Sequence, residues 1–281
     1  MINNTLVGIV TFPAIEKFLK DFTRGLSKQT DKEFDLLIIN DGLETPQLEN
    51  IIADTVCISV QKRTPIENRE FIIEYAIKHN YEYLIFADCD DIPCENRIGT
   101  IKKYLNMYDA VVHNMSVINK TGDIIIDEFI NFRKKNIEIS DILKSNFIGL
   151  GNSGFRITFL KKSLPIPAKC FAVDWWLGLN VLFSGGRIGY INQCLTQYRQ
   201  YDNNTANVLE CNESDLIKEY KLKKNIYGDL ARRYPSHKIV LLKESKYIDE
   251  IIASITSESI CLINTSVIHR WWDLLNNIRK E

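Results

Sequence analysis

The chain begins with unbroken apolar runs that alternate with segments in which apolar residues recur at helical spacing. The apolar runs predict buried strands at residues 6–11, 34–40, 56–60 and 83–87, and the periodic segments predict helices at 18–28 and 66–78. Continuous apolar strands are typical of a parallel sheet that is covered on both faces. Strands that alternate with helices indicate right-handed crossovers. We therefore expect a layered α/β fold with a parallel sheet in this half.

The pattern changes in the second half of the chain. It predicts a helix at 97–106, a β-hairpin with strands at 110–118 and 123–132, a loop of small residues at 148–154, a helix at 172–183, and strands at 187–191 and 193–198. Beyond a polar stretch at 201–204 the chain is charged, with predicted helices at 214–233, 247–254 and 266–279. We place a boundary in that stretch. The predicted organisation is a main domain at 1–204 and a mainly helical extension at 205–281.

Composition narrows the class of protein. A formal net charge of -1 over 281 residues implies no overall attraction to nucleic acid or to a membrane. The seven cysteines form no Cys-x-x-Cys pair, and neither a signal peptide nor a membrane-spanning run is evident, so we expect a reduced, cytoplasmic protein. The amphipathic segment 266–279 contains Trp271 and Trp272. It predicts peripheral contact with the inner face of a membrane, packing against the main domain, or a subunit contact in an oligomer.

Three carboxylates follow the predicted strand at 83–87. They are Asp88, Asp90 and Asp91, with Cys89 between the first two. Carboxylates that are crowded in this way repel one another, and hard oxygen ligands favour Mg²⁺ or Mn²⁺. An acidic turn that caps the next helix is the alternative interpretation.

The other strand ends add further polar groups. Thr11-Phe12-Pro13 follows the first strand, Asn40-Asp41-Gly42 follows the second, and Arg69 lies near the start of the helix after the third. The carboxyl ends of parallel strands meet at one edge of a sheet, where α/β folds bind ligands. This set suits a nucleoside diphosphate, with Asp41 at the base or ribose and a metal ion at the phosphates. Neither a P-loop nor a Gly-x-Gly-x-x-Gly motif follows the first strand, which disfavours ATP hydrolysis and dinucleotide binding.

The order of these segments resembles the inverting glycosyltransferases of family 2, over roughly residues 5 to 205. Ser27-Lys28-Gln29-Thr30 resembles the end of the family's first helix, Asp41-Gly42 its nucleotide-contacting turn, and Asp88-Cys89-Asp90 its Asp-x-Asp motif. Val173-Asp174-Trp175 resembles its Glu-Asp-Trp segment. The resemblance implies the GT-A fold, a Rossmann-like mixed central sheet flanked by helices, with the C-terminal helical extension added.

The resemblance also implies site residues and ligands. Asp174 is then the catalytic base, and Asp88, Asp90 and Asp91 hold Mn²⁺ or Mg²⁺. Donor-binding residues are then Thr11, Phe12, Pro13, Asp41, Arg69, Asp88, Cys89 and Asp90. The donor is expected to be a nucleotide sugar, most simply a UDP-sugar, and the acceptor a glycan or lipid-linked glycan in polysaccharide biosynthesis.

The chemistry of inverting transfer fits these residue types. One carboxylate must take the proton from the acceptor hydroxyl as that oxygen attacks the anomeric carbon, and a cation must neutralise the leaving diphosphate. A helix N-cap is the alternative interpretation of Asp174, and both roles are compatible. Trp175 and Trp176 are interpreted as core residues, with stacking on an acceptor sugar as the alternative for one of them.

Two other functions stay open at this point. A nucleotidyltransferase acting on a sugar phosphate also uses metal-bound carboxylates on an α/β sheet, although it usually has a Gly-rich, basic loop after the first strand, which this chain lacks. A catalytically silent nucleotide-binding or scaffold homologue is the other. It is compatible with residues that depart from the family pattern, namely Asn40, Leu43, Asn68 and Tyr201.

Overall fold

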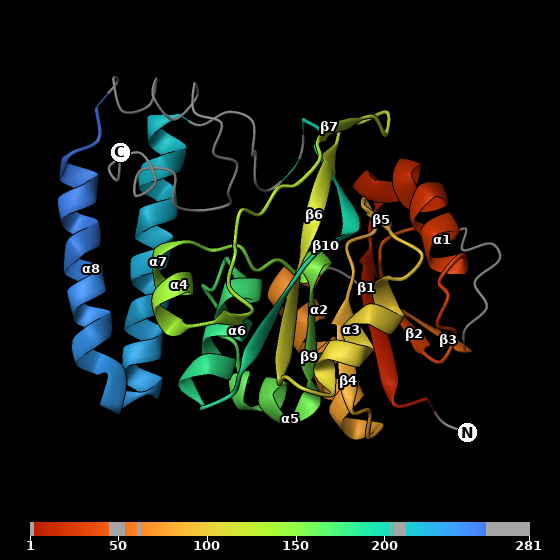
Figure 1. The fold of residues 1–281 in the computed structure, drawn as a ribbon, viewed down its shortest axis with the longest axis horizontal. Helices are drawn as coiled ribbons and strands as arrows, with labels where there is room; N and C mark the ends of the chain where they lie inside the picture. Colours follow the sequence, from red (N-terminus) through yellow and green to blue (C-terminus); the bar gives the residue numbers. More distant parts are fainter. Residues whose placement is uncertain (1–2, 45–53, 61–62, 203, 205–211, 257–281) are drawn as a thin grey trace.

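One mixed sheet forms the centre of the molecule (Figure 1). The computed structural model describes residues 3–44, 54–60, 63–202, 204 and 212–256. The strand order is β3-β2-β1-β4-β9-β6-β10-β5, with β7 paired to β6 and β8 paired to β10. The strands are β1 (Thr5–Thr11), β2 (Asp35–Asp41), β3 (Asp54–Val60), β4 (Tyr83–Phe86), β5 (Ile92–Pro93), β6 (Ala110–Ile118), β7 (Ile124–Ile126), β8 (Asn136–Ile137), β9 (Ser153–Arg156) and β10 (Ile188–Arg199).

The first four strands confirm the predicted parallel half. β1 pairs in parallel with β2 and β4, and β2 pairs in parallel with β3. Along β2, Leu37 and Ile39 belong to one core cluster, whereas Leu36 and Ile38 belong to another. This alternation shows that the strand is buried on both faces, which explains its continuous apolar run.

Helices cover both faces of the sheet. On one face lie α1 (Leu19–Ser27) and α3 (Arg97–Leu105), and on the other lie α2 (Pro65–Lys78), α5 (Ile157–Leu160) and α6 (Val173–Phe183). The remaining helical segments are η1 (Pro13–Phe18), α4 (Ile139–Lys144), η2 (Leu150–Asn152), η3 (Lys161–Ser163), α7 (Glu213–Arg233), η4 (Pro235–His237) and α8 (Lys238–Ala253). The layered α/β prediction is thus confirmed.

Several predicted elements differ in detail. The small-residue loop at 148–154 ends in β9, an antiparallel strand between β4 and β6. The two strands predicted at 187–191 and 193–198 are one strand, β10, whose register shifts after Ile191 because the exposed residues Asn192 and Gln193 interrupt the apolar pattern. The second arm of the predicted hairpin keeps only β7, since the chain then leaves the sheet to bury Phe129 and Ile130.

The C-terminal helices form an antiparallel pair at one end of the molecule (Figure 1). The helix predicted at 214–233 corresponds to α7, and the one predicted at 247–254 begins earlier, at Lys238. The segment 266–279 lies outside the described residues. The inner face of α7 belongs to the same core cluster as α6 and one face of the sheet, through Leu216, Tyr220, Ile226, Tyr227, Leu230 and Ala231.

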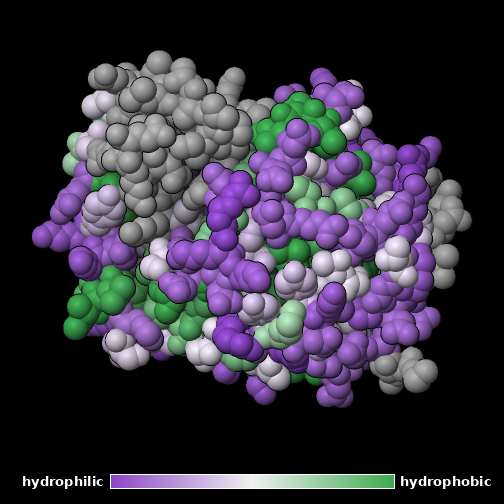
Figure 2. All heavy atoms as spheres, in the orientation of Figure 1, coloured by the Kyte–Doolittle hydropathy of each residue, from purple (hydrophilic) through white to green (hydrophobic). Residues whose placement is uncertain are grey.

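The face of the molecule in Figure 2 is largely hydrophilic, with an apolar patch over β7. Ile124 and Ile125 are exposed in that strand. Within the part of the chain that the structure describes, no helix combines the length and the apolar character needed to cross a bilayer.

Candidate active site

The acidic loop after β4 lies at the carboxyl edge of the parallel strands. Asp88 and Asp90 are partly exposed, with 38% of the Asp88 side chain accessible, whereas Asp91 is buried. Its Oδ1 lies 3.4 Å from Nη2 of Arg69. Arg69 comes from the first turns of α2, whose start is fixed by a capping box between Thr64 and Glu67. The structure therefore brings together the Asp88 carboxylate and the Arg69 guanidinium, which follow different strands in the sequence.

Asp90 and Asp91 are held by the end of β10 and the residues that follow it. Tyr201 Oη donates a 2.8 Å hydrogen bond to Oδ2 of Asp90, and the backbone N–H of Arg199 donates a 2.9 Å hydrogen bond to Oδ1 of Asp91. Burial and the neighbouring Asp88 charge raise the pKa of Asp90 to about 6. The pKa of the buried Asp91 is also raised, by its burial and by the other two acids. None of the three caps the next helix, because α3 begins at Arg97.

Gly151 closes the site from the side of η2. A Cβ built on this glycine would lie 2.9 Å from Oδ2 of Asp91 and 3.0 Å from Oδ2 of Asp88. Two carboxylate oxygens therefore converge on one point that only glycine leaves open. Among the described residues, no three His, Cys, Asp or Glu side chains form a ready metal site. A divalent ion here would need substrate phosphates, and a movement of the carboxylates toward it, to complete its shell.

A buried arginine links the end of β4, where the acidic loop begins, to η2. Arg97 donates from Nη2 to the carbonyl oxygens of Phe86, at 2.7 Å, and Gly151, at 3.0 Å. Its Nε donates to Nε2 of His113 at 3.3 Å. Burial and the Arg97 charge lower the pKa of His113, which keeps the imidazole neutral and able to accept this bond. Arg97 thus ties the end of β4 to the glycine that faces the acids.

The predicted nucleotide-binding residues lie at the ends of β1 and β2. Asp41 accepts a 2.9 Å hydrogen bond from Nδ2 of Asn68, and Phe12 and Pro13 are exposed beside the buried Thr11. Cys89 is buried in the core, so a contact from it to a donor would come from its backbone.

Asn40, which departs from the family pattern, fixes the turn after β2. Its Nδ2 donates to the carbonyl oxygen of Leu43 at 2.8 Å, and its Oδ1 accepts from the Leu43 N–H at 3.0 Å. Gly42 has a φ of 94° in this turn, a value that favours glycine. Asn40 therefore stabilises the turn that follows β2.

Asp174 is the second residue of α6 and is half-buried. It is not the N-cap, because the helix begins one residue earlier, at Val173 with Ala172 as its cap. Burial raises the pKa of Asp174 to about 7, and the charge of Asp88 adds to that effect. The Arg69 charge acts in the opposite direction. Asp174 therefore lies within electrostatic reach of Asp88 and Arg69.

Asn146 is a site residue that sequence reasoning missed. Its side chain is hydrogen-bonded to the Asp174 carboxylate, which lowers the pKa of that group. Its Oδ1 accepts a 3.0 Å hydrogen bond from the Ile148 N–H, so the amide is oriented with its NH₂ group toward the acid. No motif marks this residue in the sequence. Gly151, in contrast, could have been found, because the run of small residues at 148–154 contains it.

The two tryptophans of α6 are core residues. Trp175 and Trp176 are 0% and 1% exposed. Their Nε1 atoms donate to the carbonyl oxygens of Ile142 and Ser163, at 2.7 and 2.9 Å. The core interpretation is thus correct for both, and neither is placed to stack on an acceptor.

Comparisons with known proteins find solved structures with a similar fold. A structure of S. aureus TarS 1-349 in complex with UDP-GlcNAc matches with a TM-score of 0.64 and 15% identity, over 91% of this chain and 77% of that chain. GalNAc-T7 with UDP, GalNAc and Mn²⁺ matches with a TM-score of 0.56 and 12% identity, over 72% of this chain and 45% of that chain. At these identities the likeness concerns the fold, which is GT-A. A comparison with curated proteins gave no match.

The family model for glycosyl transferase family 2 matches residues 6–164, which include the parallel strands, the acidic loop and Arg69. This match covers more than half of the chain. The family assignment also separates the chain from the nucleotidyltransferases considered above. The chain belongs to glycosyl transferase family 2 and is a nucleotide-sugar glycosyltransferase with the GT-A fold.

Proposed function

We propose that the protein transfers a sugar from a UDP-sugar to a hydroxyl group of a glycan, with inversion at the anomeric carbon and with the help of a divalent cation. The observation that carries this proposal is the juxtaposition of Asp174, Arg69 and Asp88 at one edge of the sheet. Asp174 is a candidate general base, Arg69 supplies a positive charge, and Asp88 supplies a carboxylate that can bind a metal ion. An inverting transfer requires groups of these kinds close together.

The residues present fit a divalent ion. The support is the pair of oxygens, from Asp88 and Asp91, that converge where a Cβ on Gly151 would lie, with Asp90 alongside. Hard carboxylate oxygens in this arrangement suit Mn²⁺ or Mg²⁺. Such an ion would neutralise the charge that develops on the leaving diphosphate. Asp88, Asp90 and Asp91 are the proposed ligands.

UDP is the proposed nucleotide because both TarS and GalNAc-T7 have structures with UDP or a UDP-sugar. Thr11, Phe12, Pro13 and Asp41 then contact the nucleoside, and Arg69 and the backbone of Cys89 the diphosphate. The acceptor class, a glycan or lipid-linked glycan, and a cytoplasmic location at the inner face of a membrane stay predictions of the sequence.

Asp174 is the proposed base. It takes the proton of the acceptor hydroxyl while the oxygen forms a bond to the anomeric carbon and the bond to the diphosphate breaks. A pKa of about 7 suits this role, because a large fraction of the group is ionised at physiological pH and the carboxylate is basic enough to accept a proton. A positioned base contributes about 10²- to 10⁴-fold to the rate.

Hydrolysis of a panel of UDP-sugars, with and without Mn²⁺, tests the proposal. We expect one sugar to be released faster than the others, only with the cation present. Asp90→Ala should abolish the hydrolysis that depends on Mn²⁺, because metal-dependent donor binding is lost. Asp174→Asn should bind UDP normally in calorimetry and lose transfer. Full turnover by Asp174→Asn would show that another group is the base, and turnover without any cation would contradict the metal assignment.

A further inference from the structure

Each of the three acids in the loop after β4 has one carboxylate oxygen held by a donor from another part of the chain. The donors are Arg69 Nη2 for Asp88, Tyr201 Oη for Asp90 and the backbone N–H of Arg199 for Asp91, at 3.4, 2.8 and 2.9 Å. The held oxygens of Asp88 and Asp91 are their Oδ1 atoms, and their Oδ2 atoms are the two that converge near Gly151. Carboxylates that bind a metal ion are commonly oriented by hydrogen bonds of this kind.

The Tyr201 hydroxyl suits this task because it is neutral. It can orient the Asp90 carboxylate without cancelling the negative charge that attracts a cation. The hydroxyl donates its proton to Oδ2 of Asp90 and is thus engaged with the acid. Mn²⁺ and Mg²⁺ favour carboxylate, carbonyl and water oxygens, which makes Asp90 the better ligand of the two.

Contacts from two parts of the chain fix the position of Tyr201. Its ring centre lies 4.9 Å from that of Phe18, at the end of η1. Asn204 accepts a hydrogen bond from the Tyr201 N–H and donates one to the carbonyl oxygen of Arg199 at 2.9 Å. The buried Arg199 side chain in turn donates to the carbonyl oxygen of Asp90 at 2.8 Å. The hydroxyl is therefore held in one place relative to the acidic loop.

We propose that Tyr201 is a positioning residue for the divalent cation, which orients Asp90 through its hydroxyl and does not bind the cation itself. This inference rests on the proposed function and adds to it a residue outside the acidic loop. Tyr201 is one of the residues that depart from the family pattern, and this role gives that departure a function. Removal of the hydroxyl should weaken cation binding while the ring keeps its packing.

Calorimetric titration of the full chain with Mn²⁺, in the presence of saturating UDP, tests this inference. Tyr201→Phe keeps the ring beside Phe18 and removes only the hydroxyl. We expect it to weaken Mn²⁺ binding about 10- to 100-fold, the usual effect of losing a group that orients a metal ligand. The affinity for UDP without a cation should equal that of the wild type, because there is then no ion to position. The rate of UDP-sugar hydrolysis at saturating Mn²⁺ should approach the wild-type rate.

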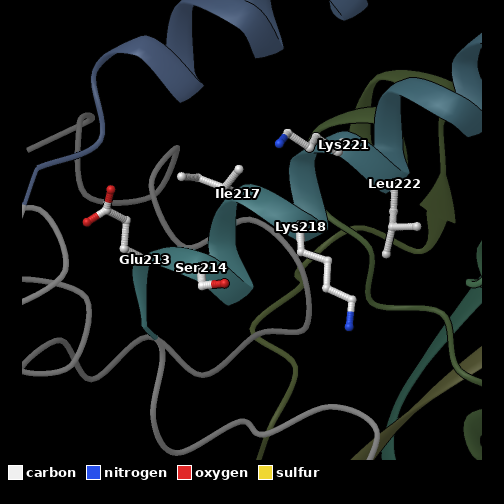
Figure 3. A pocket seen from close by; sticks show the side chains of 6 residues that line it. All are labelled: Glu213, Ser214, Ile217, Lys218, Lys221 and Leu222. Atoms are coloured by element: carbon white, nitrogen blue, oxygen red, sulfur yellow. The ribbon is translucent and has the colours of Figure 1, made fainter.

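Tyr81→Phe is the matched control. Tyr81 donates a 2.7 Å hydrogen bond to Oδ2 of Asp35, which is the same kind of contact at the amino edge of the parallel strands. Glu213→Gln controls for weak binding of Mn²⁺ by surface carboxylates, because Glu213 is exposed and lines a pocket along α7 (Figure 3). Neither change should alter the affinity for Mn²⁺.

The inference is overturned if Tyr201→Phe binds Mn²⁺ as tightly as Tyr81→Phe does. It is also overturned if Tyr201→Phe loses affinity for UDP without a cation, which would indicate a merely structural role. Tyrosinate absorption that Mn²⁺ produces in the wild type but not in Tyr201→Phe would show that the phenol is itself a ligand, against the inference. A wild-type protein that binds no Mn²⁺ with UDP would refute the metal dependence in the proposed function, and this inference with it.

Discussion

At the residue scale, the site depends on how Asp174 is held. Its partner Asn146 is 1% exposed and has its amide orientation fixed by the Ile148 N–H. A neutral donor that is fixed in this way stabilises the ionised carboxylate without pairing its charge. Asn146 therefore is expected to keep the proposed base both ionised and aimed, while Asp88 and burial make it more basic.

Replacing Asn146 with Ala should lower kcat about 10- to 100-fold, because a hydrogen bond to a charged group is worth about 1.5–3 kcal/mol. The KM for the donor should change little, since Asn146 does not contact the acidic loop in the described contacts. Steady-state kinetics with the best UDP-sugar measures both constants. Asn192→Ala, at an exposed position of β10, is the matched control and should behave as the wild type. A rise in the donor KM as large as the fall in kcat would indicate that Asn146 supports the donor site.

The pH dependence of transfer should report Asp174. Because the pKa of this carboxyl is raised to about 7, the base is protonated below that pH and kcat/KM should fall about tenfold for each unit further down. A cation beside Asp88 offsets the charge that contributes to the raised pKa, so saturating Mn²⁺ should move this limb to lower pH. Initial rates between pH 5 and 9 at two Mn²⁺ concentrations check both effects. A limb near pH 4, the ordinary range of an aspartate, would contradict the assignment.

At the scale of elements, the close approach of η2 to the acidic loop shapes the site. Gly151 is buried between β4 and β10, and its carbonyl oxygen accepts hydrogen bonds from Arg97, at 3.0 Å, and from Thr196 Oγ1, also at 3.0 Å. These bonds hold the backbone of η2 in place, so it cannot shift to accommodate a side chain. The distance between η2 and the loop thus decides whether two carboxylates can share one ion.

Gly151→Ala should abolish turnover that depends on Mn²⁺, because its methyl group would lie about 3 Å from Oδ2 of both Asp88 and Asp91. UDP-sugar hydrolysis over a range of Mn²⁺ concentrations measures the loss. Gly228→Ala in α7 is the matched control, since its Cβ would meet nothing closer than 3.8 Å. That change should raise the free energy of unfolding by about 0.5–1 kcal/mol and leave turnover intact. Normal Mn²⁺ dependence in Gly151→Ala would contradict the convergence of the two acids.

At the scale of the whole molecule, the sequence predicted those parts of the fold that rest on local pattern. The strands of the parallel half, the acidic loop and the helix of Asp174 follow from continuous apolar runs and from motif order. The position of β9 could not be predicted, because an antiparallel strand inserted between β4 and β6 is selected by pairing across the sheet and has only four residues. Asn146 was missed for the same kind of reason, since only the tertiary fold brings it to Asp174.

The relation of α7 to the main domain also lies beyond local pattern. A polar stretch at 201–204 predicts a boundary, but the inner residues of α7 share a core cluster with α6. Tyr227 donates a hydrogen bond to the carbonyl oxygen of Leu143, and its ring packs 5.6 Å from that of Trp175. We therefore expect α7 to unfold together with the helix that carries Asp174, and not as an independent extension.

Leu230→Ala tests this coupling. Leu230 is 0% exposed in the shared cluster, so its truncation should lower the free energy of unfolding by about 2–5 kcal/mol. Ile239→Ala, at a position of α8 that is 84% exposed, should change it by no more than about 0.5 kcal/mol. The measurement is denaturant unfolding in a background that carries Trp271→Phe and Trp272→Phe, so that tryptophan fluorescence reports only the buried Trp175 and Trp176. Fluorescence and circular dichroism should give coincident transitions in this background and a shared shift when Leu230→Ala is added. If helical signal were lost before the fluorescence changed, α7 would be a separate unit, and the boundary predicted at 204 would also be a boundary of stability.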